Sequence, residues 1–104
     1  LASSGLVYDS AFATAGWTVP SIASLFTGTY PSKHGAHNEN HFLSNRYKTL
    51  AEVFSENGYR TASFCKSPFL TSNSGFDRGF TDFFDISDRG NIGKIKKIIL
   101  TLNI

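Results

Sequence analysis

The sequence predicts an α/β fold in which parallel strands are flanked by helices, and one stretch indicates it most directly. Thr49 and Glu52 form a capping-box pattern, a threonine followed three residues later by a glutamate, which opens a helix that Gly58 ends. Residues 59–65 then alternate between two sets of side chains with the period of a strand. A helix, a glycine and a strand in succession are the alternation that produces a parallel sheet.

Two further elements are predicted before this unit. Residues 6–8 (LVY) are a short apolar run after a glycine and predict a strand. Pro20 suits the first turn of a helix, where its missing N–H costs nothing, and Gly28 is a plausible end for that helix. This places Thr18 at or just before the N-terminus of a helix. The predicted inward face of that helix consists of Ile22, Ala23, Leu25 and Phe26.

The remaining stretches are predicted from periodicity and composition. Residues 29–48 are polar and indicate a long excursion, and residues 80–84 indicate a short strand or a packed aromatic loop. The predicted inward stripe of the helix after Thr49 is Leu50, Val53 and Phe54. A last helical face is predicted from Ile92, Ile95, Ile99 and Leu102. Its solvated side would carry Lys94, Lys96 and Lys97.

Length and composition limit the protein to one domain or part of one. The chain has 104 residues, a formal net charge of +2, 40% hydrophobic and 17% charged residues, a profile typical of a globular chain. The lysines do not form the basic, aromatic-interleaved stripe of a nucleic-acid binder, and no apolar run approaches the ~20 residues that span a membrane. Ten phenylalanines with little charge indicate a chain that packs against more protein, or against itself, through exposed apolar surface.

The start of the chain and its cysteine content bear on where the protein works. Cys65 is the only cysteine, which excludes an internal disulfide framework and a cysteine-based zinc site. The single cysteine and the lack of a recognisable signal peptide slightly favour the cytoplasm. The sequence contains no methionine, so we expect it to be an excerpt of a longer gene product.

The residue with the clearest chemical potential is Thr18. A hydroxyl at a helix N-terminus is well placed to attack an anionic ester, because free N–H groups and the helix dipole stabilise negative charge there. A threonine hydroxyl is a weak nucleophile that needs a base or a metal ion to activate it. The alternative from spacing alone is that Thr18 is an ordinary N-cap.

Three blocks of the sequence resemble the sulfatase family of the alkaline phosphatase superfamily. Residues 18–28 (TVPSIASLFTG), followed by Tyr-Pro and His-Gly within residues 30–35, are similar to its nucleophile segment. Residues 49–62 (TLAEVFSENGYRTA) resemble its next helix and strand, and residues 75–80 (GFDRGF) resemble its Gly-Phe turn. The blocks occur in family order and together cover residues 6 to about 85.

The resemblance implies a fold, an activity and site residues. It implies a partial three-layer sandwich and one partial catalytic domain over residues 1–104. Its parts are a nucleophile segment (17–35), a helix-strand unit (49–66), the Gly-Phe turn (75–85) and a basic amphipathic tail (91–104). The implied activity is hydrolysis of small-molecule or glycan sulfate or phosphate esters, with Thr18 as both metal ligand and nucleophile. Lys66 resembles the family lysine that contacts the substrate anion, as a compact cation would.

Three departures from the family pattern affect the expected chemistry. Family sulfatases carry Cys or Ser at the nucleophile position and convert it to formylglycine, whereas Thr18 resembles the phosphodiesterase and phosphotransferase branches. Ile22 stands where the family has arginine, which removes a positive charge. Ser67-Pro68 replaces the Trp-His that follows the family lysine.

The resemblance also implies a divalent metal ion: calcium, magnesium, manganese or zinc. The family's aspartate and asparagine ligands would lie before residue 1 and after residue 104. We therefore expect this stretch alone to bind no metal and to be inactive, because hard cations need several oxygen ligands. A separate metal site formed by His34, His37 and His41 is a less favoured interpretation, since Gly35 argues against a shared helical face.

Two alternatives to an enzyme remain open. The first is a non-catalytic sulfatase-like domain that binds an anionic ligand or a protein partner, which Ile22 and the missing Trp-His favour. The second is a plain α/β packing module in which Thr18 only caps a helix.

Overall fold

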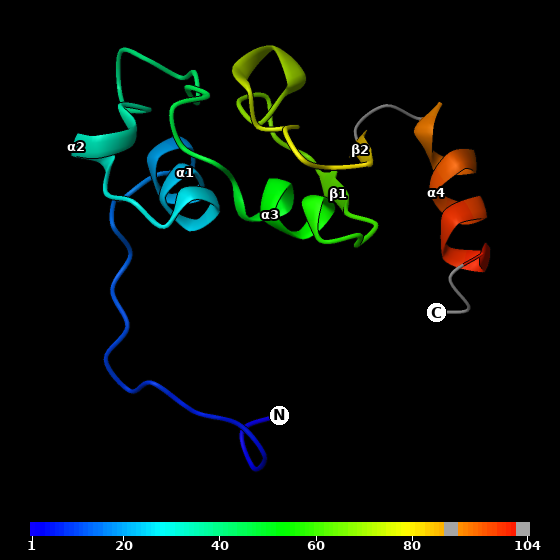
Figure 1. Ribbon diagram of the computed structural model, residues 1–104, viewed down its shortest axis with the longest axis horizontal. Helices are drawn as coiled ribbons and strands as arrows, with labels where there is room; N and C mark the ends of the chain where they lie inside the picture. The colour runs from blue at the N-terminus through cyan, green and yellow to red at the C-terminus, as the bar shows by residue number, and fades with distance from the viewer. Residues whose placement is uncertain (87–89, 102–104) are drawn as a thin grey trace.

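The computed structural model describes residues 1–86 and 90–101. The chain forms a mixed arrangement of short helices and a small parallel sheet (Figure 1). The helices are α1 (Thr18–Thr27), α2 (Pro31–His34), α3 (Leu50–Glu56) and α4 (Asn91–Thr101), with a 3-10 turn at Ser72–Ser74. The strands are β1 (Ala62–Cys65) and β2 (Asp82–Asp85).

The sheet consists of β1 and β2, which run parallel with Ala62 opposite Asp82 and Cys65 opposite Asp85. This confirms the α/β prediction with parallel strands and flanking helices. Of the two alternatives for residues 80–84, a short strand or a packed aromatic loop, the structure has the strand, which begins at Asp82. The strand predicted for residues 59–65 is shorter than expected and begins at Ala62. At the start of the sheet, the Arg60 guanidinium pairs with the Asp82 carboxylate at 2.8 Å.

Helix α1 follows the predicted signals at both ends. Pro20 lies within the first turn, and Gly28 ends the helix in the left-handed conformation (φ 66°), where its N–H donates to the Ser24 carbonyl at 2.8 Å. Val19 and Ala23 are fully buried on its inner side. The predicted inward position of Leu25 is wrong: its side chain is 67% exposed, because the core contacts the opposite side of the helix.

Helix α3 begins with the predicted capping box. The Glu52 N–H donates to the Thr49 hydroxyl at 3.1 Å, and the Thr49 N–H donates to the Glu52 carboxylate at 2.7 Å. The helix ends at Asn57, with Gly58 directly after it at φ 82°. The predicted inward stripe is wrong, since Ala51 is the buried residue of this helix. Its larger apolar side chains, all more than 40% exposed, are Leu50, Val53 and Phe54.

Thr49 also joins α3 to the Gly-Phe turn, because its hydroxyl donates to the Arg78 carbonyl at 3.0 Å. We expect Thr49→Ala to lower the free energy of unfolding by about 2 kcal/mol, since a buried cap and a second hydrogen bond are lost together. Urea denaturation measures this difference. Thr49→Ser keeps the hydroxyl and should remain close to the parent, and an equal loss in the serine variant would contradict the hydrogen-bond explanation.

The core lies between α1, the excursion of residues 29–48 and the Gly-Phe turn. It consists of Val19, Ala23, Ala36, Leu43 and Phe76, with Trp17, Ile22, Phe26 and Leu70 packed against it. Aromatic pairs extend this core toward the sheet: the Phe26 ring lies 6.1 Å from Phe76 and 5.7 Å from Phe80. The Phe64 and Phe84 rings stack at 5.6 Å across the two strands.

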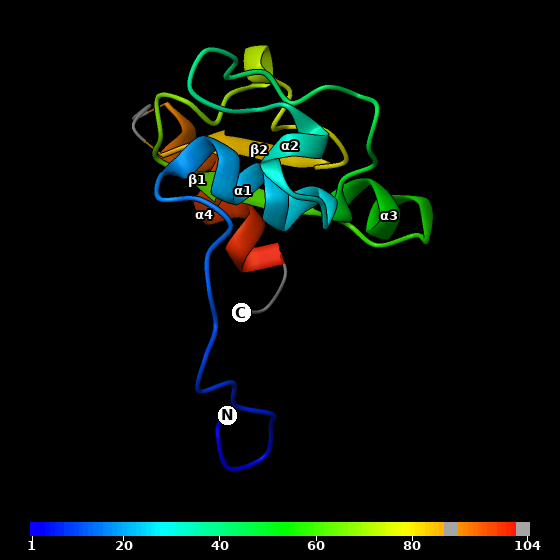
Figure 2. The same ribbon diagram turned by 90° about the vertical axis from the view of Figure 1, so that its left-hand side faces the viewer.

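The first sixteen residues form an arm that runs away from the body of the molecule (Figures 1 and 2). The prediction of a strand at residues 6–8 is wrong for the structure, in which these residues are not paired with β1 or β2. A strand forms only where a neighbour accepts its ladder of hydrogen bonds. Leu6 and Tyr8 are therefore left 78% and 73% exposed.

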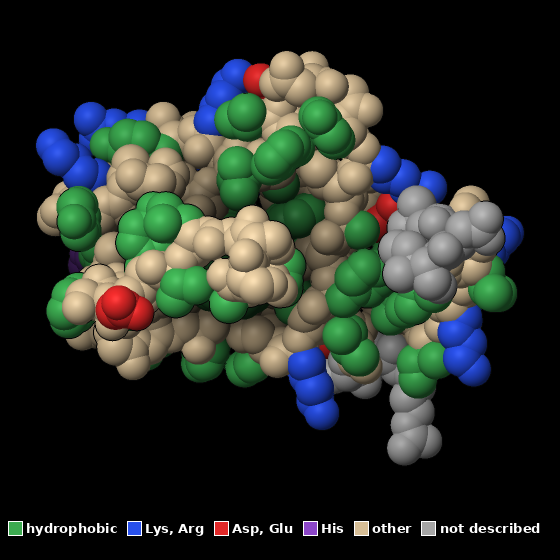
Figure 3. Space-filling view, turned by 90° about the horizontal axis from the view of Figure 1, so that it is seen from below, with side chains coloured by type: hydrophobic (Ala, Val, Ile, Leu, Met, Phe, Trp, Pro, Cys, Tyr) green, Lys and Arg blue, Asp and Glu red, His purple; other side chains and the backbone are tan. Residues whose placement is uncertain are grey.

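The predicted last helix is present as α4, with Ile95 half-buried and Ile92 and Ile99 more open. Leu102 and the end of the basic tail lie outside the described residues. Figure 3 shows hydrophobic side chains gathered around a hollow on the face seen from below. Among the described residues, no helix is long and apolar enough to cross a membrane.

Candidate active site

Thr18 is the first residue of α1, and the N-cap position is occupied by Trp17. The backbone of Trp17 is extended (φ −151°, ψ 171°), and no side chain caps the helix there. The interpretation of Thr18 as an N-cap is therefore wrong. The Thr18 side chain is exposed, and its hydroxyl makes no hydrogen bond to any described residue.

The backbone around this hydroxyl is equally open. The first hydrogen bond of α1 runs from the Ser21 N–H to the Trp17 carbonyl at 3.3 Å. Pro20 has no N–H, and the N–H groups of Thr18 and Val19 have no backbone acceptor in the described chain. A hydroxyl and two N–H groups thus share the positive end of a ten-residue helix, a combination suited to an anionic group.

Lys66 directly follows β1, and its side chain is exposed. It makes no hydrogen bond to Thr18 and no ion pair with a described residue. The loop that it begins nevertheless reaches the start of α1, because the Phe69 ring meets the Trp17 ring edge-on at 6.1 Å. The structure therefore places the loop after β1 against the residue that precedes Thr18.

His34 is buried between α1 and α2. Its Nδ1 accepts the Ala36 N–H at 3.1 Å, so Nε2 carries the proton and donates to the Ser24 hydroxyl oxygen at 3.0 Å. Burial lowers the pKa of His34, which outweighs a hydrogen bond to the Pro20 backbone that raises it, and the charge of His37 lowers it slightly further. His34 is thus a neutral structural residue that fixes α2 against α1.

This lowered pKa gives a prediction for stability. Above the usual histidine value of 6.5, both the folded and the unfolded chain hold His34 neutral. As the pH falls below 6.5, the unfolded chain takes up a proton that the folded chain resists, so the free energy of unfolding should fall until the lowered folded pKa is passed. Urea titrations between pH 7.5 and about 5 measure this slope.

The matched variants are His34→Asn and His37→Gln. His34→Asn should remove most of the fall in the free energy of unfolding below pH 6.5. His37→Gln should keep most of that fall, because burial is the main cause of the lowered pKa of His34. An unchanged slope in His34→Asn would contradict the assignment.

Comparison with known proteins adds a decisive observation to this geometry. The family model described as Sulfatase matches residues 1–97, almost the whole chain. The chain belongs to the sulfatase family. Comparison with curated proteins and with solved structures gives no significant match. At the level of the family, the protein is a sulfatase-like hydrolase with an ester substrate.

Sulfatases generally use a divalent metal ion, and the residues described here do not fit one by themselves. No group of three or more His, Cys, Asp or Glu side chains converges within residues 1–86 and 90–101. His34 uses both ring nitrogens internally, so it does not form a site with His37 and His41. The open hydroxyl of Thr18 is a single oxygen, and a hard cation needs several.

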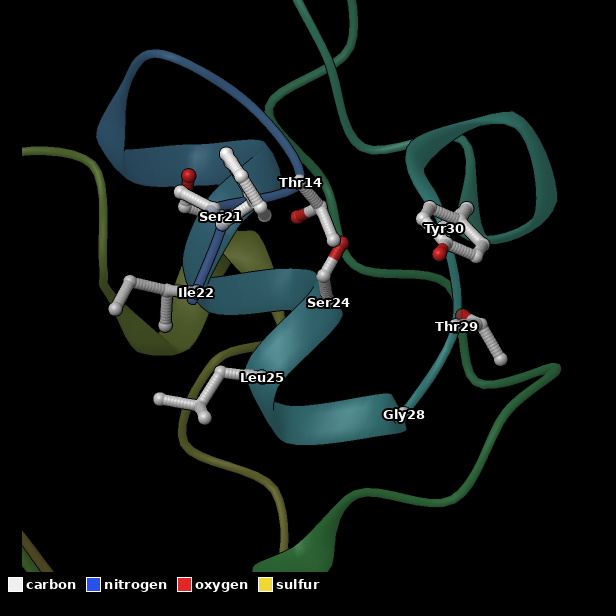
Figure 4. Close-up of a pocket in the computed structure, with 10 residues that line it drawn as sticks. Thr14, Ser21, Ile22, Ser24, Leu25, Gly28, Thr29 and Tyr30 are labelled. Atoms are coloured by element: carbon white, nitrogen blue, oxygen red, sulfur yellow. The ribbon is translucent and has the colours of Figure 1, made fainter. Parts of the chain in front are cut away.

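A cavity of about 520 Å³ lies beside α1, between the arm and the start of α2 (Figure 4). Ile22 lines it together with Leu25 and Tyr30. None of the described residues that line this cavity is charged, and Thr18 is not among them. A largely apolar cavity therefore lies next to α1, which the sequence did not predict.

Cys65, the residue before Lys66, is partly buried at the end of β1. Burial raises the pKa of its thiol, and the nearby Asp85 carboxylate adds to this increase, while a hydrogen bond from Ser63 opposes it. Its Sγ–H donates to the Leu70 carbonyl at 3.6 Å. A protonated, partly buried thiol is unreactive, so Cys65 supports the loop that follows the strand.

Proposed function

We propose that the protein hydrolyses sulfate or phosphate esters with the Thr18 hydroxyl as nucleophile. The observation that carries this proposal is the state of the α1 N-terminus, where an exposed hydroxyl without a hydrogen bond lies beside two free N–H groups. A threonine that served only structure would be expected to use its hydroxyl as Thr49 does, in a cap. In acyl, phosphoryl and sulfuryl transfer, free donors aimed at developing negative charge lower the barrier.

Lys66 is proposed to hold the anionic part of the substrate. The support is its exposure, its freedom from ion pairs in the described chain, and the contact between its loop and Trp17. An ammonium group at the end of a four-carbon chain reaches an anion some ångströms away without fixed geometry. Thr18 and Lys66 would then approach the same anion from two elements.

Phosphate esters are the proposed preference within this class. Two residues support it: Thr18 cannot become formylglycine in the manner of cysteine or serine, as the family pattern implies, and Ile22 replaces the family arginine. The ester would be attacked by a hydroxyl rather than by an aldehyde hydrate. The natural substrate would be a small molecule or a glycan.

A divalent ion, calcium, magnesium, manganese or zinc, is proposed for the complete protein. Thr18 would supply one oxygen, and residues outside 1–104 would supply the other ligands. Such an ion, when bound, would supply Lewis acidity that lowers the pKa of the hydroxyl. The stretch of 104 residues by itself is accordingly proposed to be inactive.

The test is a substrate screen on the complete protein. Aryl phosphates, aryl phosphodiesters and aryl sulfates are compared with each of the four metals and with a chelator. The proposal expects metal-dependent turnover, fastest on a phosphate ester, and none from residues 1–104 alone. Turnover by the isolated stretch would refute the metal requirement, and a preference for aryl sulfate would refute the phosphate assignment.

A second candidate function is a non-catalytic domain that binds an anionic ligand or a protein partner. The apolar cavity at Ile22 favours it, because it offers no cation where the family has one. If this alternative holds, calorimetry should detect binding of inorganic phosphate or sulfate. The substrate screen described above should then detect no turnover of any ester.

A further inference from the structure

The rings of His41, Trp17 and Phe69 form a cluster at the start of α1. The His41 ring lies 5.3 Å from the Trp17 ring and 5.5 Å from the Phe69 ring, and each pair meets edge-on. The Trp17 and Phe69 rings complete the triangle at 6.1 Å. Three segments that are distant in the sequence therefore converge beside Thr18: the residue before it, the polar excursion and the loop that begins at Lys66.

The turn that carries His41 is well fixed. His37 and Asn40 exchange backbone hydrogen bonds at 2.8 and 2.9 Å, and the Asn40 side chain donates to the Gly35 carbonyl at 2.9 Å. His41 Nε2 lies 3.2 Å from the Asn38 carbonyl oxygen, which can only accept, so this nitrogen carries a proton. Nδ1 has no partner in the described part of the chain, and His41 as a residue is exposed.

An imidazole in this state is unusual among the three histidines of the chain. His34 is buried and uses both nitrogens, and His37 lies outside the ring cluster. His41 is oriented by two aromatic rings and one carbonyl, yet keeps one nitrogen open. Proton transfer needs this combination, because the donor must be held in place and still reach the reacting group.

We infer that His41 is the general acid for the leaving group of the proposed ester hydrolysis, an inference that rests on the proposed function. The Thr18 oxygen forms a bond to phosphorus or sulfur and releases its proton to solvent. The bond from phosphorus or sulfur to the leaving oxygen breaks, and His41, entering this step as an imidazolium with a proton on each ring nitrogen, gives that oxygen its Nδ1 proton while Nε2 keeps its own. Water then cleaves the threonyl ester and restores the Thr18 hydroxyl, while His41 regains its proton from solvent.

The test compares two leaving groups in the complete, metal-loaded protein. His41→Phe keeps a ring in the cluster but cannot donate a proton, and His37→Phe is the matched control. For an alkyl or phenyl ester, kcat of His41→Phe should fall by about 100-fold or more. For a 4-nitrophenyl ester, whose leaving oxygen needs no proton, kcat should stay within about threefold of the parent. His37→Phe should change neither.

The outcomes separate the two proposals. Parent-like turnover of both esters by His41→Phe, or an equal loss on both, would refute the role of His41. If Thr18→Ala is inactive in the same assay, the proposed function would still hold without a role for His41. Failure of the parent protein to hydrolyse either ester would refute the proposed function and the role of His41 together. If His41→Phe does not fold, His41→Gln replaces it with the same expected dependence on the leaving group.

Discussion

Thr18→Ala in the complete protein is expected to reduce kcat for the best ester of the screen by about 10⁴-fold or more, because the attacking oxygen is removed. Stability should barely change. The hydroxyl is exposed and makes no hydrogen bond to the described residues, so its loss should cost no more than about 0.5 kcal/mol. Steady-state kinetics and urea denaturation on one preparation measure both effects.

Two threonine variants control this experiment. Thr18→Ser keeps an oxygen at the same position, and we expect it to retain measurable turnover. Thr49→Ala should show the reverse pattern, with lower stability and near-parent kcat, since Thr49 caps α3 rather than α1. Full turnover in Thr18→Ala would contradict the nucleophile assignment.

Gly79→Ala is the substitution with the largest expected effect on stability. A Cβ at this position would overlap the Glu52 backbone nitrogen and would lie 2.5 Å from the Ala51 carbonyl carbon, so the turn and α3 would have to separate. The backbone of Gly79 also has φ 82°, which costs an L-residue about 1 kcal/mol. With overpacking of about 1–3 kcal/mol added, we expect a loss of roughly 3 kcal/mol.

Gly58→Ala is the matched control, because Gly58 has the same φ of 82° and open space around the added Cβ. It should lose only the conformational part, about 1 kcal/mol. Urea denaturation of both variants separates backbone strain from steric overlap. Equal losses would show that the contact between Gly79 and α3 does not matter.

The sequence predicted best those elements whose signals are local. The capping box of α3 and the glycine that ends α1 act through hydrogen bonds within a few residues, so their residue types are sufficient. The parallel arrangement of β1 and β2 followed from the order of elements, and family membership covers residues 1–97.

Features that depend on distant neighbours could not be predicted in the same way. The run at residues 6–8 has strand-forming residues but lies in an arm without a strand partner. Leu50, Val53 and Phe54 have the spacing of a buried stripe, yet Ala51 faces the core because the Gly-Phe turn packs against that side of α3. The spacing of apolar residues predicts which side chains share one face of a helix. It does not predict which face packs against the rest of the protein.

At the candidate site, the sequence led to Thr18 and Lys66 through motifs, and their roles remain predictions. Two histidines of the polar excursion have different surroundings in the structure. His34 packs between α1 and α2, and His41 lies in the ring cluster beside Trp17. Their polar surroundings are alike in the sequence. Only the tertiary contacts, a buried serine in one case and two aromatic rings in the other, distinguish them.

The most direct test of Thr18 as nucleophile is detection of its covalent ester. The complete protein is mixed with the preferred aryl ester, quenched in acid within the first turnover, digested and analysed by mass spectrometry. We expect the peptide that contains Thr18 to gain the mass of one phosphoryl or sulfuryl group, at Thr18, and the Thr18→Ala protein to gain none. Product release with an unmodified Thr18 peptide, or the added group on another residue, would contradict the account.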